Sequence, residues 1–351
     1  NPDNPMYDSW QAGSAERNGG ANAWAPLSID TENGLVFIPT SSPSPDFYGG
    51  ERKGNNNYAN SLVALNALTG QVVWHYQLVH HDVWDYDVAS QPVLFEFKKG
   101  DKHIPAVVQA TKSGMLFVFN RLTGEALIPI EERPVPQNGA PGEALSPTQP
   151  FSALPSLVNN ARLEPDDAWG MMYFDSKGCR KIIESWRSDG IYTPPTLQGS
   201  IMYPGNAGGA NWGGVSVDEQ RQIVIANVMQ LPFLVKLIER EKAKEIYEGG
   251  EYEDFSWSRM EGTPYMMIRR PFLSILDVPC VSPPWGKLVA MDLKRGEIAW
   301  DVPLGTIEDL APAMVPNLEL GVPGMGGPIT TASGLVFIAA ATDDYLRAFD
   351  T

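Results

Sequence analysis

The sequence predicts an all-β fold of the β-propeller type, and three features of the chain support this prediction. A unit of strand, turn and strand that closes on a tryptophan recurs along the chain. Short stretches of alternating apolar residues lie between the copies of this unit. Glycine and proline are frequent, at 33 and 30 of 351 residues, and the chain holds 10 tryptophans. Short strands joined by tight turns, with a periodic glycine and aromatic pattern, are typical of propellers.

The repeated unit is clearest in two segments that lie far apart in the chain, "VALNALTGQVVW" at 63–74 and "VAMDLKRGEIAW" at 289–300. An Asn or Asp opens the turn in each, a Gly lies inside it, and a Trp ends the second strand. "FVFNRLTGEAL" at 117–127 and "LRAFDT" at 346–351 follow the same frame. Asn or Asp followed by Gly favours a turn, and the large Trp can pack on a neighbouring unit. A β-sandwich with chance similarity is the alternative.

Other segments complete the expected architecture. Further strands are expected at 34–40, 106–111, 200–205, 222–227 and 334–340. Residues 130–170 are rich in proline and are expected to be irregular, whereas the charged segment 235–254 suits a short surface helix with a solvated face. We expect one domain over 1–351. Because the chain stops inside a repeat, we expect an incomplete propeller that lacks blades at one or both ends.

Composition narrows the class of protein. The net charge of −16 argues against a nucleic-acid surface. We find no apolar run of about 18 residues that would span a membrane and no signal peptide. The two cysteines, Cys179 and Cys280, could form one disulfide or remain free thiols. The polar flanks of Cys179 in "SKGCRK" argue against its burial in an apolar core.

The stretch "VHHDVWDYDV" at 79–88 concentrates groups that can perform chemistry. A carboxylate that is partly shielded from water is a suitable general base. In a strand, Asp85 and Asp87 would share one face and Asp82 would lie on the other. The alternative is that these residues cap strand ends in a turn. His80 and His81 (adjacent, and therefore on opposite faces of a strand) cannot easily share a metal ion, and no Cys/His spacing supports zinc.

Five further motifs accompany the repeats: "HHDVWDYD" (80–87), "TKSGMLFVFNRLTG" (111–124), "YTPPTLQGSIMYPGN" (192–206), "NWGGVSVD" (211–218) and "GMGGPITTASGLVFIAAATDDYLRAFD" (324–350). Together they resemble the quinoprotein alcohol dehydrogenases, most of all the membrane-bound glucose and quinate/shikimate dehydrogenases that use pyrroloquinoline quinone (PQQ). The resemblance covers essentially the whole chain. It implies an eight-bladed propeller preceded by an N-terminal membrane anchor, with the anchor and the first blades outside this chain.

The resemblance also implies roles for residues of the 80–87 motif and its surroundings. Asp85 matches the catalytic aspartate, which lies close to a divalent cation, calcium or magnesium. Lys112, at the end of an apolar strand, matches the lysine that contacts the cofactor, where an ammonium can polarise a quinone carbonyl. Trp24 matches the tryptophan that stacks on the planar cofactor. Related enzymes have an asparagine metal ligand where this chain has Ser42, and a hydroxyl is the poorer ligand. Ser44 matches a hydroxyl residue near the cofactor.

Further candidates for cofactor contacts come from two later segments. The glycine-rich "GGANWGG" at 208–214 places Asn211 and Trp212 where backbone can approach a ligand closely. It is not a phosphate loop, because no Lys-Ser/Thr pair follows. Asn227, in "IAN", is an additional candidate amide. Each of these residues has structural alternatives: a core or docking role for a tryptophan, and a solvated strand end for Lys112.

The resemblance therefore predicts an oxidoreductase of the periplasmic side of the bacterial inner membrane that passes electrons to ubiquinone. Alcohol oxidation removes a proton and a hydride, and no side chain accepts a hydride, so an organic cofactor is required. We favour quinate and shikimate as substrates because "GGANWGG" is similar to the quinate branch. Quinate carries a carboxylate, and Arg187 is the suggested partner. Glucose or another polyol is the first alternative, and a non-catalytic propeller scaffold, which would need no cofactor, is the second.

Overall fold

Antiparallel sheets dominate the structure, as predicted. The computed structural model describes residues 4, 6–159, 162–310 and 318–351. Their strands form six sheets, and every strand pair in these sheets is antiparallel. None of the described helices is long and apolar enough to cross a membrane.

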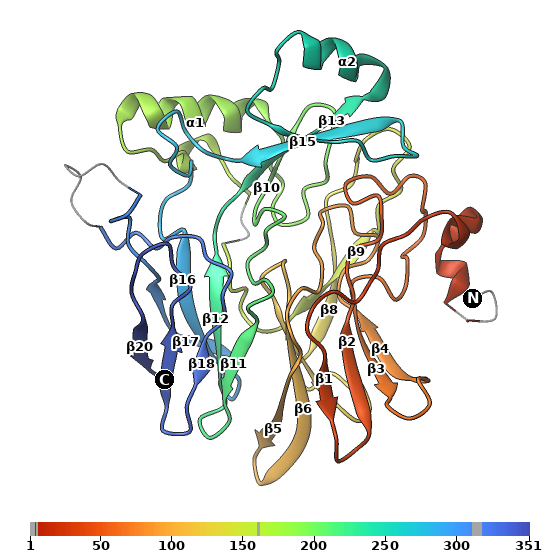
Figure 1. Cartoon of the computed structure of the whole chain (residues 1–351), viewed down its shortest axis with the longest axis vertical. Coiled ribbons are helices and arrows are strands. Elements are labelled where there is room, and N and C mark those ends of the chain that lie inside the picture. The colour runs from red at the N-terminus through yellow and green to blue at the C-terminus, as the bar shows by residue number, and fades with distance from the viewer. Residues whose placement is uncertain (1–3, 5, 160–161, 311–317) are drawn as a thin grey trace.

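Four of the sheets have the strand order of propeller blades (Figure 1). In three of them, strands that are consecutive in sequence pair in turn, whereas the fourth accommodates a long insertion between its second and third strands. The four sheets comprise β1 (Ser28–Asp30), β2 (Leu35–Pro39), β3 (Ser61–Asn66) and β4 (Val72–Gln77); β5 (Val93–Lys99), β6 (Lys102–Ala110) and β7 (Leu116–Asn120); β11 (Val215–Asp218), β12 (Ile223–Met229), β16 (Gly286–Asp292) and β17 (Glu297–Pro303); and β18 (Ile329–Thr330), β19 (Leu335–Ile338) and β20 (Arg347–Asp350). The first strands of these sheets lie next to one another: β1 meets β5, β5 meets β11, and β11 meets β18. The first strands therefore line the inner side of the arrangement.

The turns of the repeated units form as the sequence predicts. In the β3–β4 turn, the Asn66 side chain accepts hydrogen bonds from backbone N–H groups two and three residues later, at 3.0 Å each. Asp292 does the same in the β16–β17 turn, at 2.8 and 3.0 Å. Gly70 and Gly296 both have φ +69°, a conformation that favours glycine. A β-bulge falls at the same place in both units, so the sequence repeat is also a repeat of structure.

The tryptophans that close the units dock on the next sheet. The Trp74 indole N–H donates to the backbone carbonyl of Arg121 at 2.9 Å, and the ring packs on Phe119. A Cβ at Gly124 would lie 2.7 Å from the Trp74 ring, so glycine is required for this contact. Trp300 stacks on Phe349 of β20 at 6.3 Å between ring centroids. The predicted role of these residues is confirmed.

Two segments differ from the sequence prediction. Residues 130–170 are not uniformly irregular, because β8 (Ile130–Pro134) and β9 (Thr148–Ser152) form a hairpin and Pro165–Asp167 form a 3-10 helix. Further 3-10 turns occupy Tyr7–Ser9 and Gln11–Glu16. Within 235–254, the first residues complete a strand and the helix α2 covers only Arg240–Glu248. Because charged residues follow this strand directly, its alternating pattern was not recognised in the sequence.

The sixth sheet lies at the top of Figure 1, next to the two α-helices. Its strand order is β10 (Ser200–Met202), β13 (Phe233–Glu239), β15 (Tyr265–Pro271) and β14 (Ser256–Ser258). The helix α1 (Tyr173–Ser185), which the sequence did not predict, is tied to the segment after β15 by a disulfide between Cys179 and Cys280. Cys179 is 1% exposed, so the expectation from its polar flanks was wrong. The flanks lie on the outer face of α1, whereas the Cys179 sulfur faces inward.

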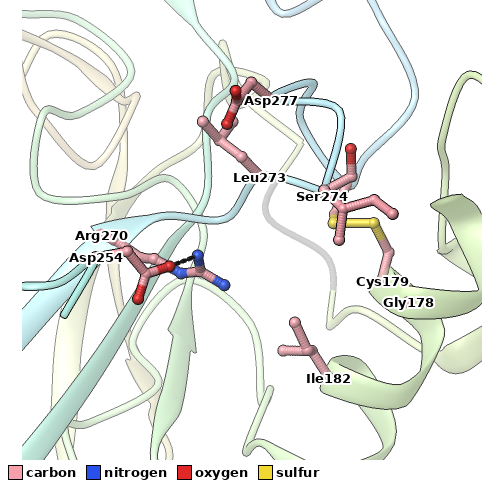
Figure 2. A pocket seen from close by; sticks show the side chains of 10 residues that line it. Gly178, Cys179, Ile182, Asp254, Arg270, Leu273, Ser274 and Asp277 are labelled. Carbon is pink, nitrogen blue, oxygen red and sulfur yellow. Dashed lines mark hydrogen bonds and ion pairs between the residues drawn. A yellow bond between two sulfur atoms is a disulfide. The ribbon is translucent and has the colours of Figure 1, made fainter. Parts of the chain in front are cut away.

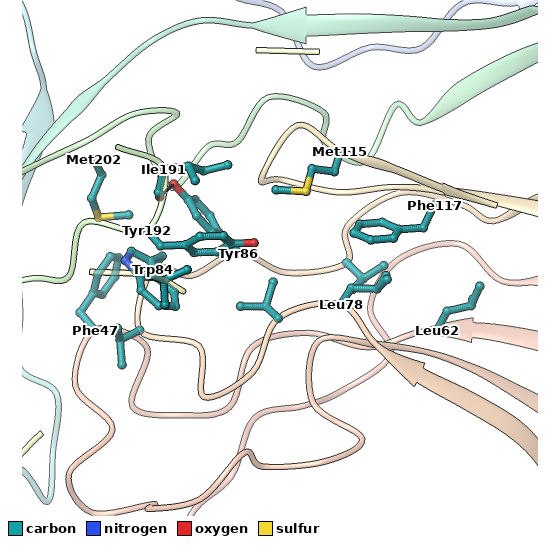
Figure 3. Packing of buried hydrophobic residues seen from close by; sticks show 14 of the residues in the cluster. Phe47, Leu62, Leu78, Trp84, Tyr86, Met115, Phe117, Ile191, Tyr192 and Met202 are labelled. Carbon is teal, nitrogen blue, oxygen red and sulfur yellow. Dashed lines mark hydrogen bonds between the residues drawn. The ribbon is translucent and has the colours of Figure 1, made fainter. Parts of the chain in front are cut away.

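Two buried clusters meet at the sixth sheet. Figure 3 shows part of the central cluster, which includes Phe47, Leu62, Leu78, Trp84, Tyr86, Met115, Phe117, Ile191, Tyr192 and Met202. Met267 of β15 also belongs to this cluster. The disulfide cluster includes Cys179, Ile183, Leu234, Ile238, Ile268, Phe272, Cys280 and Trp285. Alternate residues of β15 belong to one or the other, as the two-residue period of a strand requires. The sixth sheet thus separates the central cluster from the disulfide cluster.

Candidate active site

The stretch at 79–88 folds as an irregular loop and not as the strand considered from the sequence. Asp82 organises this loop. Its carboxylate accepts hydrogen bonds from two backbone N–H groups, two and four residues further along, at 2.8 and 2.9 Å. The Ser42 hydroxyl and the Asn60 side-chain amide also donate to it. Asp85 has a positive φ of 59°, which turns its side chain away from these donors.

Asp85 and Asp87 meet at Lys112, which lies in the turn between β6 and β7. The Lys112 ammonium donates to Asp87 at 2.7 Å, to the Asp85 backbone carbonyl at 2.8 Å and to the Asp85 carboxylate at 3.3 Å. Asp87 also accepts from the Ser42 backbone N–H at 2.6 Å. The Asp85 carboxylate is 20% exposed and the Lys112 side chain 7%. Lys112 is therefore held mainly by Asp87, and the Asp85 carboxylate remains accessible to another ligand.

The charges of this cluster determine which groups can exchange protons. Burial raises the pKa of Asp85 to about 7, although the neighbouring Lys112 ammonium acts in the opposite direction. Burial also opposes the charge on Lys112, but attraction to Asp85 and Asp87 outweighs it, and the pKa of Lys112 is raised. Lys112 thus stays cationic at neutral pH, whereas Asp85 can take up and release a proton there, as a general base must.

Two residues that the sequence did not single out also reach Asp85. The Asn206 side-chain N–H donates to the Asp85 carboxylate at 3.2 Å. Arg269 of β15 places its guanidinium 3.8 Å from the same carboxylate. Asn206 closes the motif at 192–206, so that motif was its only signal. Arg269 carried no signal, because only the folded chain brings β15 beside the 79–88 loop.

The segment at 38–50 lies beside the same loop, but its hydroxyls have different surroundings. Ser42 is 5% exposed, and its hydroxyl is engaged by Asp82. Ser44 is exposed, with its backbone N–H bonded to Gly19 at 2.9 Å. The chain around Asn22 pairs with Ser41, which brings Trp24, 46% exposed, to this side of the molecule. An indole face is available there for stacking.

The glycine-rich segment at 208–214 packs directly on Lys112. The Gly209 N–H donates to the Lys112 carbonyl at 2.7 Å, and a Cβ at Gly208 would lie 2.6 Å from Lys112 side-chain atoms. The glycines therefore permit close contact with Lys112 itself. Asn211 donates its side-chain N–H to a backbone carbonyl at 2.6 Å, and Trp212 is 52% exposed.

Asn227 of β12 is connected to this segment through the chain at 324–327. Its side-chain N–H groups donate to the carbonyls of Gly324 and Gly326 at 3.0 and 2.9 Å. The Gly213 N–H donates to Met325 in the same chain segment. The Asn227 side-chain oxygen is buried and has no partner among the described residues. Lys112, Asn211, Trp212 and Asn227 thus lie along one continuous set of contacts.

The histidines and Arg187 are engaged elsewhere. His80 contacts Glu132 at 3.0 Å, and His81 contacts Glu143 at 2.8 Å, so each histidine has its own carboxylate. No group of three or more His, Cys, Asp or Glu in the described ranges is arranged to hold a metal ion. Arg187 pairs with Asp189 at 2.5 Å and donates to the carbonyls of residues 137 and 138. It has no contact with the Asp85 cluster.

A cavity of about 320 Å³ lies beside the disulfide and away from this cluster. Figure 2 shows its lining, which includes Cys179, Asp254, Arg270 and Ser274. Arg270 forms an ion pair with Asp254, and the cysteines are bonded to each other. Asp277 is the other carboxylate of the lining. The contact of a carboxylate with a buried ammonium occurs instead at Asp85 and Lys112.

The fold and this site agree with what the chain is similar to. The family model for the glucose/ethanol/alcohol dehydrogenase β-propeller domain of PQQ proteins matches residues 1–351. The chain therefore belongs to the family of PQQ-dependent quinoprotein dehydrogenases.

The curated relatives include glucose and quinate dehydrogenases of this family. The chain is 41% identical to the quinoprotein glucose dehydrogenase of Escherichia coli, over 94% of this chain and 42% of that protein. It is also 41% identical to the probable quinate dehydrogenase (quinone) of Xanthomonas campestris pv. juglandis, over 97% of this chain and 44% of that protein. The quinate/shikimate dehydrogenase (quinone) of Acinetobacter baylyi is 39% identical, over 100% of this chain and 44% of that protein. The chain spans less than half the length of these relatives.

Solved structures agree on the fold. A europium-containing methanol dehydrogenase superposes with a TM-score of 0.62 at 18% identity, over 98% of this chain and 47% of that one. The quinohemoprotein alcohol dehydrogenase of Comamonas testosteroni superposes with a TM-score of 0.58 at 21% identity, over 95% of this chain and 40% of that one.

The residues present fit a flat anionic quinone accompanied by a divalent cation. Lys112 supplies a fixed positive charge. The side-chain oxygens of Asn206 and Asn227 are buried without a partner in the described part of the chain, which is uncommon for buried amides and leaves them available to a ligand. Amide and carboxylate oxygens are the ligands that hard cations prefer. The exposed indoles of Trp24 and Trp212 offer surfaces for stacking.

Proposed function

We propose that the full-length protein is a PQQ-dependent dehydrogenase of cyclic hydroxy acids, which oxidises quinate to 3-dehydroquinate and shikimate to 3-dehydroshikimate. The observation that carries this proposal is the contact between Asp85 and Lys112. The Asp85 carboxylate, with a pKa of about 7, contacts the buried Lys112 ammonium and is partly exposed to solvent. That combination suits removal of a hydroxyl proton and stabilisation of the negative charge that develops.

The chain's own residues have separate tasks in this reaction. Bound PQQ supplies the electrophilic carbonyl that accepts the hydride. Asp85 accepts the hydroxyl proton of the substrate. The Lys112 ammonium, oriented by Asp87 at 2.7 Å, donates a hydrogen bond where oxygen becomes negative. Asn206 orients the Asp85 carboxylate through its hydrogen bond at 3.2 Å.

The same geometry supports proposed contacts with the cofactor and with a cation. We assign cofactor contacts to Lys112 and to Trp24, Ser44, Asn211, Trp212 and Asn227. Asp85 is the proposed protein ligand of a calcium or magnesium ion. Ser42 is the weaker candidate, because its hydroxyl already donates to Asp82.

A glucose dehydrogenase is the second candidate, because the glucose and quinate relatives are equally similar to this chain, at 41%. Both candidates use the same base and cofactor and differ only in the substrate. Ubiquinone as electron acceptor, an N-terminal membrane anchor and a position on the periplasmic side of the inner membrane are part of the proposal for the full-length protein. A scaffold role is disfavoured, since a scaffold has no use for a poised base beside Lys112.

The test is dye reduction by the full-length protein reconstituted with PQQ and calcium or magnesium. Quinate, shikimate, glucose and glycerol are compared in parallel. We expect reduction with quinate and shikimate. Reduction with glucose alone would move the protein to the other branch, and failure with every substrate together with failure to bind PQQ would refute a dehydrogenase.

A further inference from the structure

Two neighbouring arginines of β15 serve opposite sides of the sixth sheet. Met267 belongs to the central cluster and Ile268 to the disulfide cluster. By the two-residue period of a strand, Arg269 continues the row of Met267, and Arg270 continues that of Ile268. Arg270 pairs with Asp254 at the cavity beside the disulfide (Figure 2). Arg269 instead lies on the side of the sheet that faces the central cluster, next to the Asp85 carboxylate.

The guanidinium of Arg269 has unused hydrogen-bonding capacity. Its ion-pair partner is Asp85 at 3.8 Å, beyond hydrogen-bond distance, and it forms no hydrogen bond with any residue that the structure describes. The plane of Phe47, itself 3% exposed, supports it at 5.6 Å. The side chain is 34% exposed. An arginine carries five N–H donors, so this one is held in place with its donors available to a ligand.

Lys112 does not have this freedom. Its ammonium already contacts Asp87 at 2.7 Å and the Asp85 carbonyl at 2.8 Å. Among the charged side chains that contact Asp85, Arg269 is therefore the cation that can accept a new anionic partner. A planar guanidinium matches a carboxylate with two parallel hydrogen bonds, which an ammonium cannot provide.

We propose that Arg269 binds the carboxylate of the substrate and so makes the site selective for hydroxy acids over neutral polyols. This inference rests on the proposed function and names the group that determines its substrate. In quinate the carboxylate is two ring carbons from the carbon that is oxidised. A hydroxyl on Asp85 and a carboxylate on Arg269 are thus 1,3-related substituents of one six-membered ring, which suits the proximity of the two side chains.

The experiment compares Arg269→Gln and Arg269→Lys with the matched control Arg270→Gln in the full-length, PQQ-loaded enzyme. Steady-state kinetics with quinate give KM and kcat. Calorimetric titration with cyclohexanecarboxylate and with the neutral cyclohexanecarboxamide measures binding without turnover. PQQ affinity and the thermal midpoint are measured for each variant.

We expect Arg269→Gln to raise the KM for quinate by roughly 10- to 100-fold, the loss typical of a charge-assisted contact, with a smaller change in kcat. The variant should also lose the preference for cyclohexanecarboxylate over its amide. Arg269→Lys should retain part of both, and Arg270→Gln should match the wild type.

Three results would overturn the inference. These are an unchanged KM in Arg269→Gln, an equal loss for both probes, or a loss of PQQ affinity, which would make the anion that Arg269 binds one of the cofactor's carboxylates. Should Arg269→Gln fail to fold, the two-probe comparison in Arg269→Lys decides. A wild-type enzyme that oxidises no substrate would refute the proposed function instead, and is recognised before any variant is made.

Discussion

Asp82 and Asp85 lie three residues apart in one loop, yet their environments are opposite. The Asp82 carboxylate accepts four hydrogen bonds, from two backbone N–H groups, Ser42 and Asn60, and the residue is 1% exposed. The Asp85 carboxylate has contacts of 3.2 Å or longer, to Asn206, Lys112 and Arg269, and is 20% exposed.

The difference separates structure from chemistry. A carboxylate whose acceptor positions are filled by protein donors holds backbone in place, even though burial raises the pKa of Asp82 as well. One with loose contacts and a raised pKa can exchange a proton and accept a substrate or a cation. From sequence spacing alone, both aspartates are candidates for the base. The number of hydrogen bonds that each carboxylate accepts distinguishes them.

The largest expected effect is the loss of turnover in Asp85→Asn. The amide keeps the shape but cannot accept a proton, so kcat should fall by about 10²–10⁴-fold, the range for a lost general base. PQQ affinity should change little, and stability should not fall. Dye-coupled kinetics and fluorescence titration of the cofactor on the full-length protein measure both. Turnover near the wild-type value would remove Asp85 from the role of base.

The same substitution at Asp82 should act on stability instead. An amide nitrogen cannot accept, so at least one buried N–H donor loses its partner, which costs about 2 kcal/mol. Urea unfolding should show a lower midpoint with an unchanged slope. The folded fraction of Asp82→Asn should keep most of its turnover. A stable Asp82→Asn variant with turnover as low as that of Asp85→Asn would contradict the comparison.

A third prediction concerns pH, and its sign follows from the pKa of about 7 for Asp85. Because burial raises this pKa above its unfolded value, ionised Asp85 disfavours the folded state. On account of this group, stability falls as pH rises from about 4 to 7 and is level above 7. The stability advantage of Asp85→Asn over the wild type should therefore grow over that interval.

Turnover should have the opposite dependence on pH, because the base must be ionised, and the divalent cation proposed to bind Asp85 should move the fall in turnover to a pH below 7. Chemical unfolding of the cofactor-free protein from pH 4 to 8, alongside initial rates of the loaded enzyme, tests both trends. Parallel curves for the wild type and Asp85→Asn would show that another group titrates.

The sequence predicted the regular part of the fold well, because its determinants are local. The Asn66 and Asp292 turns and the docking of Trp74 and Trp300 follow from residue types at fixed spacing. The helix α1 and the β8–β9 hairpin were missed. Their apolar residues are interleaved with charges and prolines, so the periodicity is weak, and packing against the disulfide cluster stabilises α1 instead.

At the site, the sequence predicted Asp85 and Lys112 as candidates, and their contact at 3.3 Å keeps both as the leading catalytic prediction. It could not separate Asp82 from Asp85, since a strand was considered where the chain forms a loop. Arg187, suggested for a substrate carboxylate, is occupied by Asp189 and two backbone carbonyls.

The sequence by itself determined the class of fold, the family and the acidic stretch that holds the proposed base, because repeats, turns and clustered side chains are properties of neighbouring residues. The tertiary structure alone decided which aspartate is free, that Cys179 pairs with Cys280, and that Arg269 stands beside Asp85. Each of these features depends on segments that meet only after the chain has folded. Local sequence does not encode burial or the number of hydrogen bonds that a side chain forms, and these two properties distinguish residues that look alike in the sequence.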